Sequence, residues 1–213
     1  MASPKQLTYA GFTALAKAYG IEPAQACAIM LKESKAKSFD DQGRPYILFE
    51  RHQFFRSLER ILGRAKAVET SRSNPSLCNA SPTAAGDYGT SSAQWGKFSV
   101  AQSINRIAAI ESCSWGAGQV MGYHWKLLGY SSAQDMVNAM FKSEVAQVEA
   151  IFRYLKENNL ISALNAGRVD EVARGYNGVN YAKTGYDKDL DALIKKCKGL
   201  LANDRLGTLE VFQ

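Results

Sequence analysis

Residues 26–34 constrain the fold most strongly, because their apolar side chains recur at helical spacing. Ala26, Ile29 and Met30 fall on one helix face, and Glu33 ends that face. Such a carboxylate is either solvated in the last turn or partly desolvated, and desolvation raises the pKa of a carboxyl group. A raised pKa suits a general acid near neutral pH. Taken alone, the stripe favours the solvated glutamate.

Length and charge narrow the class of protein. The chain has 213 residues, of which 46% are hydrophobic and 22% charged, as expected for one globular domain with a sizeable core. A formal charge of +6 and a pI of about 9.1 favour anionic partners such as nucleic acid, anionic lipid or anionic cell-wall polymers. Lys and Arg form no run of five, and no nucleic-acid-binding motif is found, so nucleic acid is the weak candidate.

The sequence gives no sign of secretion, membrane insertion or metal binding. It lacks the apolar block of a secretory signal and any stretch of about eighteen apolar residues, so we expect synthesis in the host cytoplasm and no stable membrane insertion. Without an HExxH motif we expect no metal and no cofactor. Reduced structural thiols are expected rather than disulfides, because the cysteines are far apart and form no CxxC pair: Cys27, Cys78, Cys113 and Cys197.

Apolar periodicity predicts a mainly helical chain. A short strand is expected at residues 46–50, and residues 113–122 are expected to form a turn that opens another helix. The polar stretch 70–96 is expected to be a long loop that serves as a rim or lid. One domain is predicted over residues 1–206, and residues 207–213 resemble a cloning remnant. A helix is predicted to start at residue 23 and to end between residues 34 and 37. Other helices are predicted at residues 8–19, 52–62, 98–111, 133–141, 144–158, 161–166, 170–176 and 186–201.

A second carboxylate follows the predicted strand. Period two places Tyr46, Leu48 and Glu50 on the same side of the strand. Taken alone, Glu50 is more simply explained by a salt bridge to Arg51 or Arg56.

Four motifs stand out along the chain: Glu33-Ser34 and residues 41–52, 114–122 and 173–178. Together they resemble the N-acetylmuramidase family of phage endolysins, in the lysozyme superfamily with goose-type lysozymes and soluble lytic transglycosylases. The resemblance runs from about residue 7 to residue 198. It departs from the family at residues 35–37, where glycines are usual, and at Gly118, which is often aromatic or bulky in relatives. It implies an α+β lysozyme-like fold, mainly α, with a small β-hairpin beside the active-site cleft.

The resemblance implies a peptidoglycan glycan-strand hydrolase that cleaves the β-1,4 bond between MurNAc and GlcNAc, with Glu33 as general acid. Glycosidic cleavage also uses a second carboxylate, and its distance from the first decides the outcome. Glu50 is the first candidate and Asp41 the second, because a strand positions a side chain better than a turn does. If neither carboxylate reaches the site, attack by the muramyl hydroxyl makes a lytic transglycosylase the better interpretation.

Further residues are candidates for substrate binding. Ser34, Gln119, Tyr176 and Asn177 are expected to hydrogen-bond sugar hydroxyl and acetamido groups. Trp115 or Tyr181 would give an apolar face to a pyranose ring. The sequence favours core packing for Trp115, and helix capping is an alternative role for Asn177. The expected partners are peptidoglycan and an anionic cell-envelope surface. We expect a monomer that reaches the wall after release through the inner membrane.

Two other classes of function stay open. Cys113 precedes His124, and cell-wall endopeptidases can use such a pair as nucleophile and base, although four scattered thiols make a chance pairing easy. The non-enzymatic alternative is a basic helical module that binds the cell wall or DNA.

Overall fold

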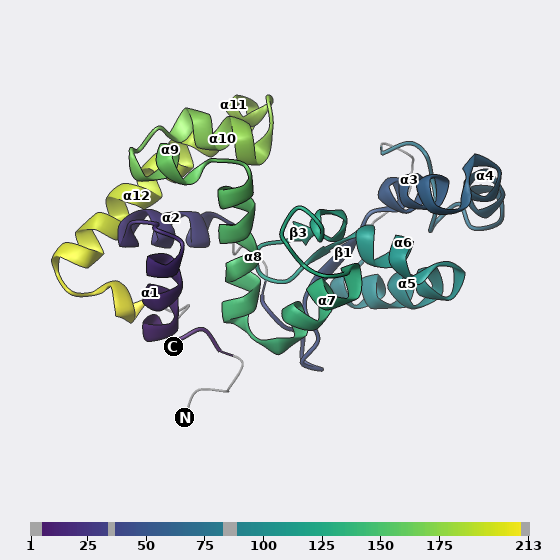
Figure 1. Cartoon of the computed structure of the whole chain (residues 1–213), viewed down its shortest axis with the longest axis horizontal. Coiled ribbons are helices and arrows are strands. Elements are labelled where there is room, and N and C mark those ends of the chain that lie inside the picture. Colours follow the sequence, from purple (N-terminus) through teal and green to yellow (C-terminus); the bar gives the residue numbers. More distant parts are fainter. Residues whose placement is uncertain (1–5, 34–36, 83–88, 210–213) are drawn as a thin grey trace. The chain divides into compact units, whose positions relative to one another are not determined.

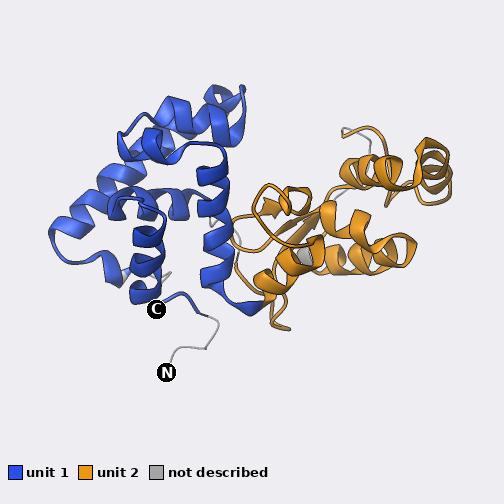
Figure 2. Ribbon diagram, viewed as in Figure 1, with its two compact units in different colours: residues 1–36, 142–213 blue, residues 37–141 orange. Residues whose placement is uncertain are grey.

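The computed structural model describes residues 6–33, 37–82 and 89–209. Within these ranges the chain forms twelve α-helices and one small antiparallel sheet of three strands, which confirms the predicted mainly α, lysozyme-like class with a small β-hairpin (Figure 1). No described helix is both long and apolar enough to cross a membrane. Contacts divide the chain into two compact units, coloured separately in Figure 2: unit 1 holds residues 1–36 and 142–213, and unit 2 holds residues 37–141. This division does not test the prediction of one catalytic domain over residues 1–206.

Unit 1 is helical throughout its described part. Its core is formed mainly by α2, whose residues are buried almost all round, packed against α12. Thr8 caps the first helix by accepting a hydrogen bond from the Gly11 N–H. The helices are α1 (Tyr9–Ala18), α2 (Pro23–Glu33), α8 (Glu144–Glu157), α9 (Ile161–Asn165), α10 (Val169–Asn177), α11 (Tyr181–Thr184) and α12 (Tyr186–Ala202).

A disulfide joins the two central helices of unit 1. Cys27 on α2 and Cys197 on α12 are bonded and completely buried. The expectation of reduced thiols is therefore wrong for this pair, while Cys78 and Cys113 are free and buried as expected. The pair could not be recognised from spacing, because 170 positions separate its members and only the packing of α2 on α12 brings them together.

Unit 2 surrounds the sheet with helices. The strands β1 (Ile47–Phe49), β2 (Cys113–Trp115) and β3 (Val120–Met121) pair in that order, with Ile47 opposite Trp115 and Phe49 opposite Cys113. A 3-10 turn, η1 (Gly122–His124), follows the hairpin. The helices are α3 (Arg51–Leu62), α4 (Arg64–Ser73), α5 (Ser91–Ile104), α6 (Arg106–Glu111) and α7 (Ala133–Lys142).

Three expectations for unit 2 are corrected. Residues 113–122 form the β2–β3 hairpin rather than a turn into a helix, and a Cβ on Gly122 would lie 2.0 Å from the Ile110 carbonyl oxygen. The helix expected at residues 98–111 is broken at Asn105, whose side chain accepts from the Ala108 N–H and starts α6. The loop expected at residues 70–96 is shorter, because α4 reaches Ser73 and α5 begins at Ser91; residues 83–88 of it lie outside the described part.

The C-terminal segment continues the structure of unit 1 beyond α12. A short 3-10 helix, η2 (Leu206–Thr208), follows, with Leu206 buried and Gly207 against the Tyr9 ring. Residues 210–213 lie outside the described part, and the cloning origin of residues 207–213 stays a prediction.

Candidate active site

Glu33 is the last residue of α2 and lies against the first residue of α12. The Tyr186 hydroxyl donates a hydrogen bond of 2.5 Å to Glu33 Oε1. Burial raises the pKa of Tyr186 far above its ordinary value, and the charge of Glu33 and this hydrogen bond raise it further. The phenol therefore stays protonated at physiological pH, and its hydroxyl is the donor in this hydrogen bond. Glu33 is partly buried, which rules out the fully solvated last-turn glutamate that its stripe alone favours.

A row of tyrosine rings continues from this contact. The rings of Tyr186 and Tyr176 stack with centroids 6.3 Å apart, and Tyr176 packs edge-on against Tyr154 at 5.0 Å. Burial raises the pKa of Tyr176 well above its usual range, with further contributions from the charges of Glu33 and Tyr154. The structure thus brings two predicted site residues of unit 1, Glu33 and Tyr176, into the same aromatic surroundings.

Lys32, the residue before Glu33 on α2, forms an ion pair with α12. Lys32 is 6% exposed and its ammonium lies 2.6 Å from Asp189 Oδ2, while it also lies 4.7 Å from the centre of the Tyr186 ring. Lys32 therefore fixes the α2–α12 junction and supports the Tyr186 ring that holds Glu33.

Two other predicted residues lie at the end of α10 and the start of α11. Asn177 Nδ2 donates to Thr184 Oγ1 at 3.1 Å, and that hydroxyl donates to the Tyr181 carbonyl. Gly175 on the same helix packs so tightly that a Cβ would lie 2.5 Å from a methyl of Leu160. Asn177 is exposed and Tyr181 half-buried, so both present polar groups at the surface of unit 1. Ser34 lies outside the described residues.

Glu50 stands between β1 and α3 in unit 2. Its N–H donates to the Ser112 carbonyl at 2.8 Å, which fixes its backbone beside β2. The side chain is 20% exposed, and one carboxylate oxygen lies 3.4 Å from His52 Nδ1. Burial lowers the pKa of His52, with Glu50 opposing and Arg56 adding to the effect, so the imidazole is neutral at pH 7. The contact of Glu50 with His52 is therefore a contact with a neutral ring at that pH, and the salt bridge expected to Arg51 or Arg56 stays a prediction.

Asp41, the second candidate, lies in the exposed turn before β1. Its neighbour Asp40 makes the contacts that hold this turn, accepting from the Gln42 and Arg44 backbone N–H groups and from the Arg44 guanidinium. Although partial burial acts to raise it, these hydrogen bonds lower the net pKa of Asp40 below 3.8. The turn is therefore rigid, and Asp41 is the more solvated of the two candidates in unit 2.

Gln119 sits at the tip of the β2–β3 hairpin with φ 46°, a left-handed conformation that is rare outside glycine. Its Oε1 accepts from Ser114 Oγ at 2.7 Å, and its Nε2 donates to the carbonyls of Gly116 at 2.8 Å and Tyr46 at 3.4 Å. These bonds tie the hairpin tip to the residue before β1. The observed contacts of Gln119 are structural, and its predicted contact with a sugar stays untested.

Trp115 and Cys113 both lie in the core of unit 2. Trp115 is completely buried and its indole N–H donates to the Ile110 carbonyl, in keeping with the core role favoured by the sequence. Burial raises the pKa of Cys113 well above its ordinary range, and the charge of Glu50 adds to this. A buried, protonated thiol is a poor nucleophile, which counts against a cysteine endopeptidase that would use Cys113 and His124.

Sequence reasoning missed two residues that the geometry brings forward. Tyr186 binds Glu33 from 153 positions away, and its position after Gly185, at the start of the last helix, was the only local signal. Trp95 is half-buried on α5 and packs edge-on against Trp115 with centroids 6.0 Å apart. Trp95 lies in the stretch 70–96, which the sequence predicts to be a loop, so the sequence gives its ring no expected role.

Comparison with known proteins identifies the family. The family model for N-acetylmuramidase matches residues 22–198. The crystal structure of a Burkholderia AP3 phage endolysin resembles this one with a TM-score of 0.83 and 34% sequence identity, over 93% of this chain and 74% of that chain. A comparison with curated proteins gives no match. The chain therefore belongs to the N-acetylmuramidase family and is an endolysin-like peptidoglycan hydrolase.

Proposed function

We propose that the protein cleaves the β-1,4 bond between MurNAc and GlcNAc in peptidoglycan, with Glu33 as the general acid. The observation that carries the proposal is the hydrogen bond from Tyr186 to Glu33 at the end of α2. It holds one oxygen of the carboxyl group against a neutral donor at the junction of α2 and α12. The Glu-Ser pair at a helix end, which resembles the catalytic position of the family, supports the same assignment.

The chemistry requires one proton transfer and one stabilised cation. Protonated Glu33 would deliver its proton to the glycosidic oxygen as the bond from that oxygen to the anomeric carbon breaks. The sugar then passes through an oxocarbenium-like transition state, which a second carboxylate stabilises directly or by activating water. Glu50 is our first choice for that group and Asp41 the second, because Glu50 is held by its backbone bond to Ser112.

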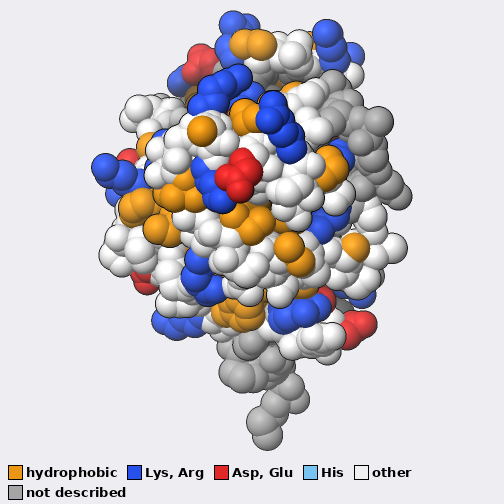
Figure 3. Space-filling model, turned by 90° about the vertical axis from the view of Figure 1, so that its right-hand side faces the viewer, with side chains coloured by type: hydrophobic (Ala, Val, Ile, Leu, Met, Phe, Trp, Pro, Cys, Tyr) orange, Lys and Arg blue, Asp and Glu red, His pale blue; other side chains and the backbone are white. Residues whose placement is uncertain are grey.

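Basic side chains support contact with an anionic cell wall. The α3–α4 segment, residues 51–73, carries six Lys or Arg residues against two Glu residues. The face seen in Figure 3 likewise displays many more Lys and Arg side chains than Asp and Glu side chains. Such a surface attracts anionic polymers over about 10 Å at 0.1 M salt.

The Glu33→Gln variant tests the proposal. It keeps the size of the side chain and its ability to accept from Tyr186 but removes the transferable proton. We expect clearing of purified peptidoglycan to fall at least about 100-fold. The matched control is Glu157→Gln, which neutralises an exposed glutamate at the end of α8 and should leave the rate unchanged.

Two further measurements complete this test. Equal midpoints of thermal unfolding for Glu33→Gln and wild type would show that the loss of activity does not come from a loss of stability. Full activity in Glu33→Gln would remove Glu33 from the mechanism. Mass spectrometry of the products should find reducing muramic acid ends, whereas anhydro ends would identify a transglycosylase.

A further inference from the structure

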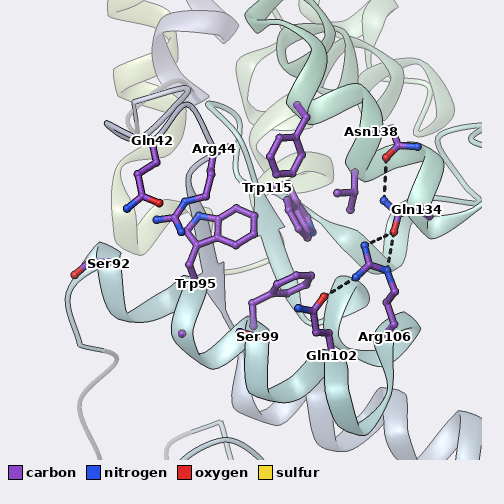
Figure 4. Close-up of a pocket in the computed structure, with 14 residues that line it drawn as sticks. Gln42, Arg44, Ser92, Trp95, Ser99, Gln102, Arg106, Trp115, Gln134 and Asn138 are labelled. Atoms are coloured by element: carbon purple, nitrogen blue, oxygen red, sulfur yellow. Dashed lines mark hydrogen bonds between the residues drawn. The ribbon is translucent and has the colours of Figure 1, made fainter.

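Unit 2 contains a pocket of about 640 Å³ that the proposed chemistry does not use (Figure 4). Its size lies within the range of small-ligand sites. Its apolar side is built on Trp95, whose ring packs edge-on against Phe98 at 5.4 Å and Phe141 at 5.9 Å, with buried Trp115 behind them. The wall thus offers one partly exposed aromatic ring held by three others.

The guanidinium of Arg106 forms the opposite, polar side of the pocket, and hydrogen bonds within the protein hold it in place. Arg106 donates from Nε and Nη2 to Gln134 Oε1 at 2.8 and 2.6 Å, and from Nη1 to Gln102 Oε1. Gln134 in turn donates to Asn138 Oδ1 at 2.9 Å, so the row of dashed bonds in Figure 4 orients the guanidinium. A guanidinium has five N–H donors, and these contacts use three of them. Two donors and the full charge are left for a ligand.

The charges of the lining select for an anion. The residues that line the pocket, all within the described part of unit 2, include Arg44 and Arg106 but no Asp or Glu. Arg44 lies 5.0 Å from the centre of the Trp95 ring and is paired with Asp40, so its charge is partly offset. The acceptors on Arg106 are neutral amides, which leave its charge uncompensated. A carboxylate fits this fork in a bidentate way, and an apolar group beside the carboxylate would cover Trp95.

We propose that this pocket binds a free carboxylate of the peptide stems of peptidoglycan, with Arg106 as the anion-binding residue and Trp95 as the apolar contact. The inference rests on the proposed function, because peptidoglycan is the substrate that brings such stems to the protein. The proposed pocket would be a binding site for the peptide stem in unit 2, in addition to the residues proposed to cleave the glycan strand. A neutral sugar is a poorer match, since a hydroxyl group accepts from a guanidinium without the charge attraction that a carboxylate gains.

Binding of a soluble stem peptide tests this without any cleavage. The probe is synthetic L-Ala-γ-D-Glu-meso-diaminopimelate-D-Ala, titrated into wild-type protein by calorimetry. We expect Arg106→Gln to raise Kd about tenfold or more, because a charged bidentate contact is lost. Ser99→Glu should do the same by placing an anion on the exposed rim of the pocket. The control Arg168→Gln removes an equal charge at the start of α10 in unit 1, outside the pocket, and should change Kd less than twofold.

Ligand variants give the second half of the test. Amidation of the free carboxylates should weaken binding as much as Arg106→Gln does, and a GlcNAc disaccharide should not compete. No measurable binding of the peptide, equal binding by Arg106→Gln and wild type, or competition by the disaccharide would each overturn the proposal. Glu33→Gln should bind the peptide with unchanged Kd. A failure of Glu33 as general acid is therefore distinguishable from a failure of this site.

Discussion

The two leading carboxylates of the protein lie in differently built units. Glu33 ends a buried helix of unit 1, where a phenol donates to it, aromatic rings follow, and the adjacent lysine is paired with Asp189. Glu50 follows a strand of unit 2, where its contacts include an imidazole and a backbone carbonyl. A neutral, aromatic environment suits a carboxyl group that changes its protonation during reaction, whereas polar surroundings suit one that stays charged. The difference supports our proposal that Glu33 transfers the proton and that Glu50 stays charged.

The largest expected effect separates Glu50 from Asp41 within unit 2. Replacing Glu50 by Gln should lower the release of reducing ends from peptidoglycan about 100-fold, because the charge that stabilises the transition state is lost. Replacing Asp41 by Asn should cost less than about threefold, because Asp41 is solvated in its turn. A larger loss for Asp41→Asn than for Glu50→Gln would reverse our assignment of the second carboxylate.

The next effect concerns how each unit is held together. The disulfide ties α2 to α12 in unit 1, whereas the described cysteines of unit 2 are free thiols. Replacing Cys27 and Cys197 by Ala should lower the free energy of unfolding by about 2–4 kcal/mol, measured by denaturant titration without reductant. Wild type treated with reductant should shift by a similar amount. An unchanged midpoint in both would show that helix packing alone holds Glu33 next to Tyr186.

A smaller effect distinguishes positioning from substrate binding among the tyrosines. Tyr186→Phe removes the donor to Glu33, so kcat should fall about tenfold with little change in KM. Tyr176→Phe keeps the stacked ring and removes only a hydroxyl that we expect to contact sugar, so its main effect should be on KM. Identical changes in kcat and KM for the two variants would mean that the row of rings acts only through packing.

The sequence predicted the helices of unit 1 well, because their signals are local. Apolar periodicity, the Gly20 stop and Pro23 in a first turn place both ends of α1 within one residue and the start of α2 at its observed residue. The predicted end of α2, at residues 34–37, falls largely outside the described part of the chain. The break at Asn105 was not predicted, since apolar residues continue across it, yet Val100 and Ile107 are both 51% exposed. The position of the β2–β3 hairpin was not predicted, because strands of three and two residues are too short to show period two.

The candidate site was predictable only in part. Glu33, Glu50 and Tyr176 lie in motifs that can be read along the chain. Their surroundings depend on contacts across long separations, such as Tyr186 with Glu33 over 153 positions and Trp95 with Trp115 over 20. No short-range pattern encodes which helix packs on which. The pocket around Arg106 is the extreme case, because α5, α6 and α7 must all be in place before Gln102 and Gln134 can hold the guanidinium.

The most direct test of Glu33 as general acid uses aryl β-glycosides of the peptide-free disaccharide of GlcNAc and MurNAc. The aryl leaving groups differ in acidity. A phenol of low pKa departs without a proton, so a variant that lacks only the acid should recover on such a substrate. We expect Glu33→Gln to be at least about 100-fold slower than wild type on the phenyl glycoside but within about fivefold of it on the dinitrophenyl glycoside. An equal loss on both substrates would contradict proton donation by Glu33.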